Sequence, residues 1–202
     1  MGRFQDRRSA GVSREQRKPM IEYSEDLKFW LRMEDLTRSG GLAPEQNKKR
    51  ADLILQERPA IVFETGVFTG SSTVTILECL KQLDHGILYS VDDESLIKKF
   101  TCCFVTDDLK KNWAYLKMKS DEAFETFKDD FKIDIFLHDS DHSAENMKFE
   151  FNWAYQHINN NGWIVSHDTH NNSAWDDFCE TVNDNVIESF KVLSLCGVRI
   201  KK

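Results

Sequence analysis

Two stretches in the second half of the chain join apolar residues to acids and histidines. In IFLHDSDHS, residues 135–143, three hydrocarbon side chains lead into two carboxylates and two imidazoles. GWIVSHDTH, residues 162–170, repeats the pattern. Carboxylates and imidazoles bind divalent cations and move protons in catalysis. A solvated acidic turn would explain either stretch alone, but the two together favour a site.

Two earlier stretches also carry polar residues after apolar ones. In ETGVFTGSS, residues 64–72, Gly66 and Gly70 let the chain turn sharply and let a ligand approach the backbone. The G-x-x-x-G spacing lacks the pyrophosphate fingerprint of nicotinamide enzymes. Farther along, ILYSVDD ends in Asp92 and Asp93, and an acid at this place in an α/β protein commonly holds ribose hydroxyls.

The elements around these stretches indicate an α/β protein. Helices are expected at 24–41, capped by Ser24, and at 44–59, with Pro44 in the first turn. Strands then alternate with helices, which predicts a Rossmann-like, doubly wound, mostly parallel sheet with helices on both faces. FKVLSLCGVRIKK predicts a closing antiparallel hairpin around Cys196 and Gly197. The carboxyl ends of parallel strands meet at one edge, where Glu64, Asp92, Asp139 and Asp168 would gather.

Composition bounds the class of protein. A chain of 202 residues suits one well-buried domain, and its net charge of −7 makes nucleic-acid binding unfavourable. Residues 1–20 are basic and aperiodic, which predicts a flexible tail. No apolar run resembles a membrane span or a signal-peptide core, so a cytoplasmic protein is expected. The five cysteines show no C-x-x-C spacing and are expected to be reduced thiols.

In their order along the chain, ETGVFTGSS, SVDD, IDIFLHDSDHS and GWIVSHDT resemble a class I S-adenosylmethionine-dependent methyltransferase. The likeness is greatest to the small, metal-dependent O-methyltransferases, including those that act on antibiotic sugars. It covers residues 58–202, the expected methyltransferase domain. Residues 21–57 match no motif of the family. We expect these N-terminal helices to form either a lid or a dimer contact, and a dimer contact would make the protein a homo-oligomer.

The resemblance implies a role for each matching residue. Asp92 would hold the ribose hydroxyls of S-adenosylmethionine, and Asp121 would lie near its adenine. The residues that would surround the rest of the cofactor are Glu64, Gly66, Gly70, Ser71 and Ser72. The ligands of a divalent metal would be Asp139 and Asp168, with His167 as a third. Asp141 would be the general base, with His142 as the alternative.

Two positions depart from the family pattern. Ser140 replaces the usual glycine, and His167 stands where some metal-dependent relatives carry a second carboxylate. Oxygen ligands favour magnesium, which is the expected metal, whereas an imidazole ligand makes manganese or iron more plausible and keeps them as alternatives.

The expected function is therefore methyl transfer to a hydroxyl of a small molecule, assisted by a divalent metal. A cation beside that hydroxyl would lower its pKa, and a carboxylate or imidazole would take the proton. One alternative is a catalytically silent methyltransferase-like domain that binds a partner. Another is a metal-dependent enzyme of different chemistry on the same scaffold. Trp153 and Tyr155 are expected in the core face of a helix, and Trp175 is expected to border the substrate.

Overall fold

The computed structural model of the chain describes residues 21–32, 43–96, 101–128 and 130–202. A seven-stranded sheet with the order β3-β2-β1-β4-β5-β7-β6 runs through it. Its strands are β1 Ile61–Thr65, β2 Ile87–Val91, β3 Trp113–Leu116, β4 Ile133–His138, β5 Ile158–Ser166, β6 Val186–Val192 and β7 Leu195–Ile200. Strands β1 to β5 pair in parallel, and β7 pairs antiparallel with β5 and β6. This architecture confirms the predicted mostly parallel sheet with a C-terminal antiparallel pair.

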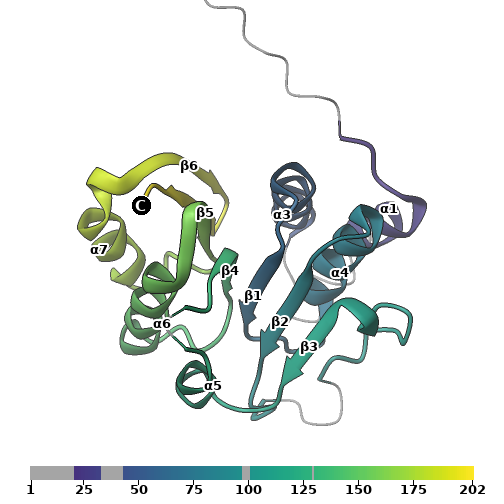
Figure 1. The fold of residues 1–202 in the computed structure, drawn as a ribbon, viewed down its shortest axis with the longest axis horizontal. Coiled ribbons are helices and arrows are strands. Elements are labelled where there is room, and N and C mark those ends of the chain that lie inside the picture. The colour runs from purple at the N-terminus through teal and green to yellow at the C-terminus, as the bar shows by residue number, and fades with distance from the viewer. Residues whose placement is uncertain (1–20, 33–42, 97–100, 129) are drawn as a thin grey trace, which may run out of the picture.

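Helices cover both faces of the sheet (Figure 1). One face carries α1 Glu25–Arg32, α3 Pro44–Glu57 and α4 Ser71–Leu83. The other carries α5 Ser120–Thr126, α6 Ala144–His157 and α7 Ala174–Thr181. Short 3₁₀ helices, η2 Lys110–Asn112 and η3 Asn183–Asn185, precede β3 and β6. Because successive strand side chains point to opposite faces, each buried strand contributes to both apolar cores.

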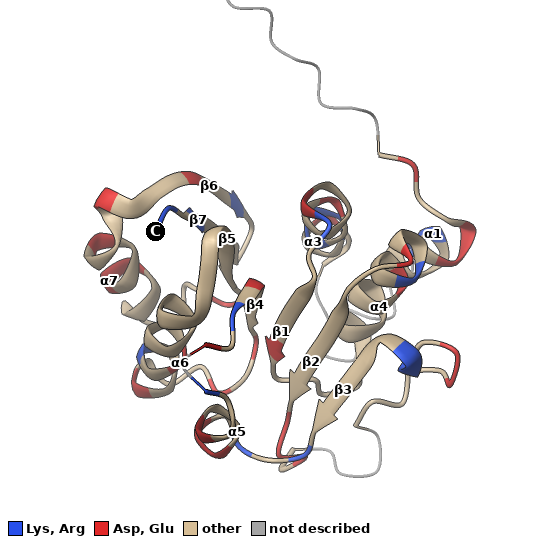
Figure 2. Ribbon diagram, viewed as in Figure 1, with Lys and Arg blue, Asp and Glu red and all other residues tan. Residues whose placement is uncertain are grey.

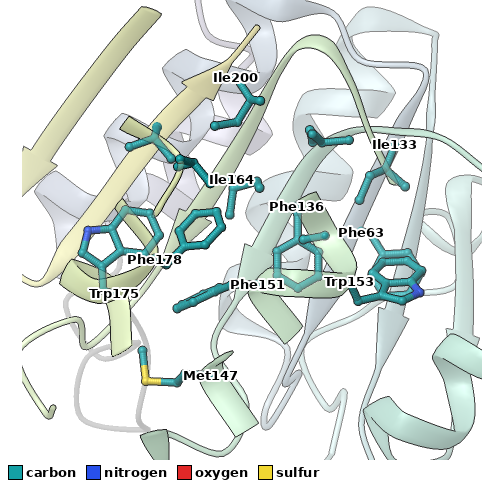
Figure 3. Close-up of a cluster of buried hydrophobic side chains, with 14 of the residues drawn as sticks. Phe63, Ile133, Phe136, Met147, Phe151, Trp153, Ile164, Trp175, Phe178 and Ile200 are labelled. Carbon is teal, nitrogen blue, oxygen red and sulfur yellow. The ribbon is translucent and has the colours of Figure 1, made fainter. Parts of the chain in front are cut away.

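The core under α5, α6 and α7 is rich in aromatic rings (Figure 3). Trp153 stacks on Phe124 with ring centroids 4.0 Å apart, and Tyr155 packs against the same cluster. The prediction that both residues belong to a core-facing helix is confirmed. Trp175 is only 5% exposed and meets the ring of Phe151 edge-on. The apolar face of α7 turns Trp175 into the core, which does not favour the expectation that it borders the substrate.

The opposite core includes the N-terminal helices. Leu27 of α1 and Ile54 of α3 are fully buried against the sheet and α4. Ser24 caps α1 as predicted, since its Oγ accepts a hydrogen bond of 3.2 Å from the backbone N of Leu27. Helix α3 begins at Pro44, also as predicted. The basic tail at 1–20 and the continuation of the first helix over 33–41 lie outside the described residues.

The C-terminal hairpin turns earlier than predicted. Its turn lies at Leu193 and Ser194, whereas Cys196 and Gly197 belong to β7. A Cβ on Gly197 would stand 2.4 Å from Cε1 of Phe190 on the paired strand. The glycine therefore makes room for an aromatic ring across the ladder and does not form the turn.

Two expectations from composition can also be compared with the structure. All five cysteines are free thiols, as predicted. No helix in the described part of the chain is long and apolar enough to cross a membrane.

Candidate active site

The exits of five neighbouring strands are aligned by backbone hydrogen bonds that continue the sheet. The N–H groups of Asp92, Gly66, Asp139 and His167 donate to the carbonyls of Leu116, Val91, Thr65 and His138, over 3.2, 2.8, 2.9 and 3.0 Å respectively. Figure 2 shows acidic residues at the tip of β1 and in the segment after β2. The polar residues predicted from separate stretches thus lie along one edge, where open α/β sheets bind ligands.

Four of these residues form a cluster at the ends of β4 and β5. Nδ1 of His167 lies 2.9 Å from Oδ1 of Asp139, and its Nε2 lies 3.4 Å from Oδ1 of Asp168. Nε2 of His142 lies 3.7 Å from Oδ1 of Asp139 and 3.9 Å from Oδ2 of Asp168. The structure therefore brings together the three residues predicted as metal ligands and adds His142.

The donor atoms of this cluster suit a divalent metal ion. Those of Asp139, His142 and His167 all lie within 4.8 Å of one another. Two ligands on opposite sides of one ion, each bound at about 2.0–2.5 Å, are separated by no more than about 4–5 Å. Asp168 holds a left-handed backbone conformation, with φ of 50°. Such a conformation is uncommon for a residue other than glycine and is concentrated at functional sites.

His142 presents an unused nitrogen to the acids. Its side chain is 24% exposed, and among the described residues its buried Nε2 has no hydrogen-bond partner. Burial, with a smaller effect of the neighbouring His138, lowers the pKa of His142, whereas Asp139 and Asp168 act in the opposite direction. The lowered pKa favours the neutral imidazole, in which one ring nitrogen carries a lone pair that can accept a proton or bind a cation.

Asp141 occupies a different position from the one the sequence suggested. The strand ends at His138, and the chain then turns toward α6, so the alternation of an extended segment does not reach Asp141. Its Oδ1 accepts from the backbone N of Ser143 at 2.9 Å, and its Oδ2 accepts from Ser143 Oγ at 3.0 Å. Ser143 in turn caps α6 through the backbone N of Asn146. The carboxylate of Asp141 thus stabilises the start of a helix and is not part of the acid–histidine cluster.

Gly66 brings the glycine turn into contact with that cluster. It has φ of +84°, and a Cβ there would stand 2.1 Å from the carbonyl O of Asp139 and 2.8 Å from the backbone N of Ser140. Gly70, with φ of +86°, is the N-cap of α4. Only a glycine fits at position 66, because the backbone of Asp139 and Ser140 leaves no room for a Cβ. The turn therefore lies directly beside the end of β4.

Asp92 holds the same turn from the other side. Its Oδ2 accepts from the backbone N atoms of Val67 and Phe68, at 2.8 and 2.9 Å, and its Oδ1 accepts from that of Glu94 at 2.6 Å. Asp92 is half-buried next to the turn. Asp121 is exposed in the first turn of α5, where its Oδ1 accepts from the backbone N of Glu122.

Glu64 lies beneath the turn and is fully buried. Its oxygens accept hydrogen bonds of 2.7, 2.8 and 2.9 Å from the hydroxyls of Ser72, Thr73 and Ser90. Burial raises the pKa of Glu64, although nearby Arg50 and the hydroxyl donors act in the opposite direction. Ser71, the first residue of α4, is also buried. Both residues thus support the turn from inside the protein.

A buried polar network under the cluster was missed by the sequence reasoning. Glu150 of α6 is fully buried, and its Oε2 lies 2.7 Å from Nδ1 of His138 and accepts a hydrogen bond of 2.5 Å from Thr65. Its Oε1 accepts from Ser140 Oγ at 2.8 Å. The only signal in the sequence is an acid on the face of α6 that also carries Phe151 and other buried residues.

Comparisons with known proteins assign the chain to a family. Residues 63–169 match the family model of a methyltransferase domain, and the chain matches no curated protein by sequence. Among solved structures, it is similar to an O-methyltransferase from Bacillus cereus with S-adenosylhomocysteine, at TM-score 0.69 and 14% identity over 91% of this chain and 94% of that one.

Two further structures are similar to the chain. One is the O-methyltransferase TomG from Streptomyces achromogenes with S-adenosylmethionine, at TM-score 0.68 and 12% identity over 91% of this chain and 93% of that one. The other is the methyltransferase PaMTH1 from Podospora anserina with S-adenosylhomocysteine, at TM-score 0.62 and 11% identity over 89% of each chain. These likenesses concern the fold. The family match extends over more than half of the sequence, and the chain therefore belongs to the methyltransferase domain family.

Proposed function

We propose that the protein transfers the methyl group of S-adenosylmethionine to a hydroxyl of a small molecule, with the help of a divalent metal ion. The observation that carries this proposal is the cluster of Asp139, His142, His167 and Asp168 beside the glycine turn at Gly66. Similar folds that hold S-adenosylmethionine or S-adenosylhomocysteine, some of them named O-methyltransferases, support it.

The cofactor would lie over the exits of β1 and β2. Its ribose would be near Asp92, and its sulfonium would be near the glycine turn and Asp139, with Glu64 and the serines of α4 supporting the turn from below. We retain Asp121 as the residue nearest the adenine. Methyl transfer is an in-line displacement, so holding the two reactants in register supplies much of the rate acceleration.

We propose Asp139, His167 and Asp168 as the metal ligands and leave His142, whose donor atom also lies within 4.8 Å of those of Asp139 and His167, to act as the base. The ion, when bound, lowers the pKa of a substrate hydroxyl and orients it. Because the cluster mixes imidazole with carboxylate, we propose manganese or iron(II) ahead of magnesium, which prefers oxygen ligands. The departure of His167 from the family pattern, noted in the sequence, thus affects which metal binds.

His142 would take the proton from the hydroxyl. Its Nε2 is unpaired among the described residues and neighbours both acids, whereas the oxygens of Asp141 are bonded to Ser143. We therefore assign the base to His142 and give Asp141 a positioning role at the start of α6. A general base contributes about 10²–10⁴-fold to the rate.

Calorimetry with S-adenosylmethionine, with and without Mn²⁺, tests the proposal first. Binding of the cofactor would be followed by a screen of small phenols, sugars and alcohols for production of S-adenosylhomocysteine. A silent binding domain would give no turnover with any acceptor. Failure to bind S-adenosylmethionine would refute the proposal that the protein is a methyltransferase that uses this cofactor.

Two variants separate the roles within the cluster. Asp168→Asn should weaken Mn²⁺ binding by more than about tenfold, while cofactor binding stays near that of the wild type. Even the loss of a residue that only hydrogen-bonds to a metal ligand typically lowers metal affinity about 10–100-fold. Asp176→Asn, an exposed acid on α7, is the matched control. His142→Gln should retain the metal and lose rate. Loss of the metal in His142→Gln would make that residue a ligand instead.

A further inference from the structure

The first half of α3 turns polar side chains toward the interior. Gln46, Asn47 and Arg50 are 3%, 2% and 1% exposed. Gln46 is satisfied, since its Nε2 donates to Ser194 Oγ at 3.0 Å and its Oε1 accepts from the backbone N of Ala43 at 2.9 Å. Burying a guanidinium is costly unless its donors find partners, so Arg50 calls for an explanation.

Two nitrogens of the Arg50 guanidinium, Nε and Nη1, are buried and have no hydrogen-bond partner in the described part of the chain. Its Nη1 forms an ion pair with Oε1 of Glu64, but the distance of 4.0 Å is too long for a hydrogen bond. Both Glu64 oxygens already accept from hydroxyls. Oδ1 of Asn47 is likewise buried and has no hydrogen-bond partner among the described residues. One helix face therefore presents two open donors and one open acceptor.

The position of Arg50 relates these groups to the candidate active site. Burial lowers the pKa of Arg50, and the negative charges of Asp139 and Glu64 oppose that effect. Glu64 lies near the exit of β1, and Asp139 follows β4. Because its Nη1 lies 4.0 Å from Oε1 of Glu64, the guanidinium lies near the carboxyl end of β1, under the glycine turn that Glu64 supports.

The chemistry of the missing partner follows if S-adenosylmethionine is the cofactor, so this inference rests on the proposed function. Its sulfonium bears three groups that diverge from one another. The ribose would point toward Asp92 and the methyl toward the cluster at Asp139. The third group ends in a carboxylate and an ammonium, and the remaining direction, over the end of β1, leads to α3.

We propose that Arg50 binds the carboxylate of the amino-acid end of S-adenosylmethionine, with Asn47 Oδ1 accepting from its ammonium group. A guanidinium matches a carboxylate with two parallel hydrogen bonds. Helix α3, outside the stretches that resemble the family, would then provide part of the cofactor site and select cofactors that carry a carboxylate.

Calorimetry with three ligands tests this assignment: S-adenosylmethionine, decarboxylated S-adenosylmethionine and 5′-methylthioadenosine, which lacks the amino-acid end. The wild type should prefer S-adenosylmethionine over its decarboxylated form by about 10–100-fold, the usual strength of a charge-assisted hydrogen bond. Arg50→Met should abolish that preference and leave 5′-methylthioadenosine binding unchanged. If Arg50→Met does not fold, Arg50→Lys can replace it in the test. The lysine keeps the charge but not the paired geometry, so we expect a smaller loss of preference.

Lys48→Met, which removes an exposed charge from the same helix, is the control for net charge. Equal weakening of all three ligands in the Arg50 variants would make Arg50 a structural residue and overturn the assignment. An unchanged preference would overturn it too. A wild-type protein that binds no S-adenosylmethionine would instead refute the proposed function, which is a distinguishable result.

Discussion

Replacing Gly66 with alanine should disturb both the stability of the protein and its metal site. The new Cβ would stand 2.1 Å from the carbonyl O and 2.5 Å from the carbonyl C of Asp139. These are backbone atoms, which cannot swing away as the end of a flexible side chain could. The end of β4 would have to move, and the side chain of Asp139 would move with it.

The expected cost has two parts. A left-handed conformation costs an alanine roughly 1–2 kcal/mol relative to glycine, and forcing extra atoms into a packed contact adds about 1–3 kcal/mol. Gly70→Ala provides a matched control, because Gly70 has nearly the same φ, +86° against +84°, but the atoms nearest to its Cβ would be Val105 Cγ2 at 3.1 Å and Cys102 Cα at 3.3 Å, both farther than the 2.1 Å at Gly66. The two variants share the conformational cost and differ mainly in the backbone clash.

Urea unfolding followed by circular dichroism would measure the difference. We expect Gly66→Ala to be less stable than Gly70→Ala by about 1–3 kcal/mol, or about 2–12 °C in Tm for a chain of this size. Mn²⁺ affinity should fall in Gly66→Ala and persist in Gly70→Ala. Equal stability of the two variants, with metal binding intact in both, would refute the role assigned to the contact between Gly66 and Asp139.

Two further predictions concern ionisable groups. Burial alone would raise the pKa of Glu150, but its hydrogen bond and charge interaction with His138 lower it overall. Because the pKa is depressed in the folded state, this carboxylate contributes stability above its unfolded pKa, near pH 4.5, and that contribution is lost as the pH falls through the folded pKa. Unfolding midpoints measured on acidification below about pH 4.5 should therefore drop less steeply in Glu150→Gln than in the wild type, and parallel curves would contradict this. Burial raises the pKa of the Cys102 thiol to about 12, whereas Cys103 is exposed. Iodoacetamide at about pH 8 should label Cys103 first, which peptide mass spectrometry would show; faster labelling of Cys102 would contradict the burial.

The alternation of elements and the glycine turn could be predicted because each is encoded locally. An apolar strand such as IVFE, a G-x-x-x-G turn and an amphipathic helix are neighbours in sequence, and their periodicity identifies them without knowledge of the rest. The gathering of Asp92, Asp139 and His167 at one edge follows as well, since parallel strands place all their carboxyl ends on the same side. The C-terminal hairpin was predicted, but its turn was placed too late in the chain. The sequence pattern places Gly197 in the turn, whereas in the structure it makes room for the ring of Phe190 on the paired strand.

The remaining features depend on contacts between residues far apart in the chain. Whether Asp141 or His142 faces the cluster is decided by where the chain leaves β4 and how α6 is capped, which no periodicity encodes. Arg50 and Glu150 carry charges that a sequence alone would assign to solvent, yet both are buried against the ends of the central strands. The sequence by itself determined which residue types reach this edge of the sheet. Only the tertiary structure decided which of their atoms are in contact, because those contacts depend on how strands and helices far apart in the chain pack against one another.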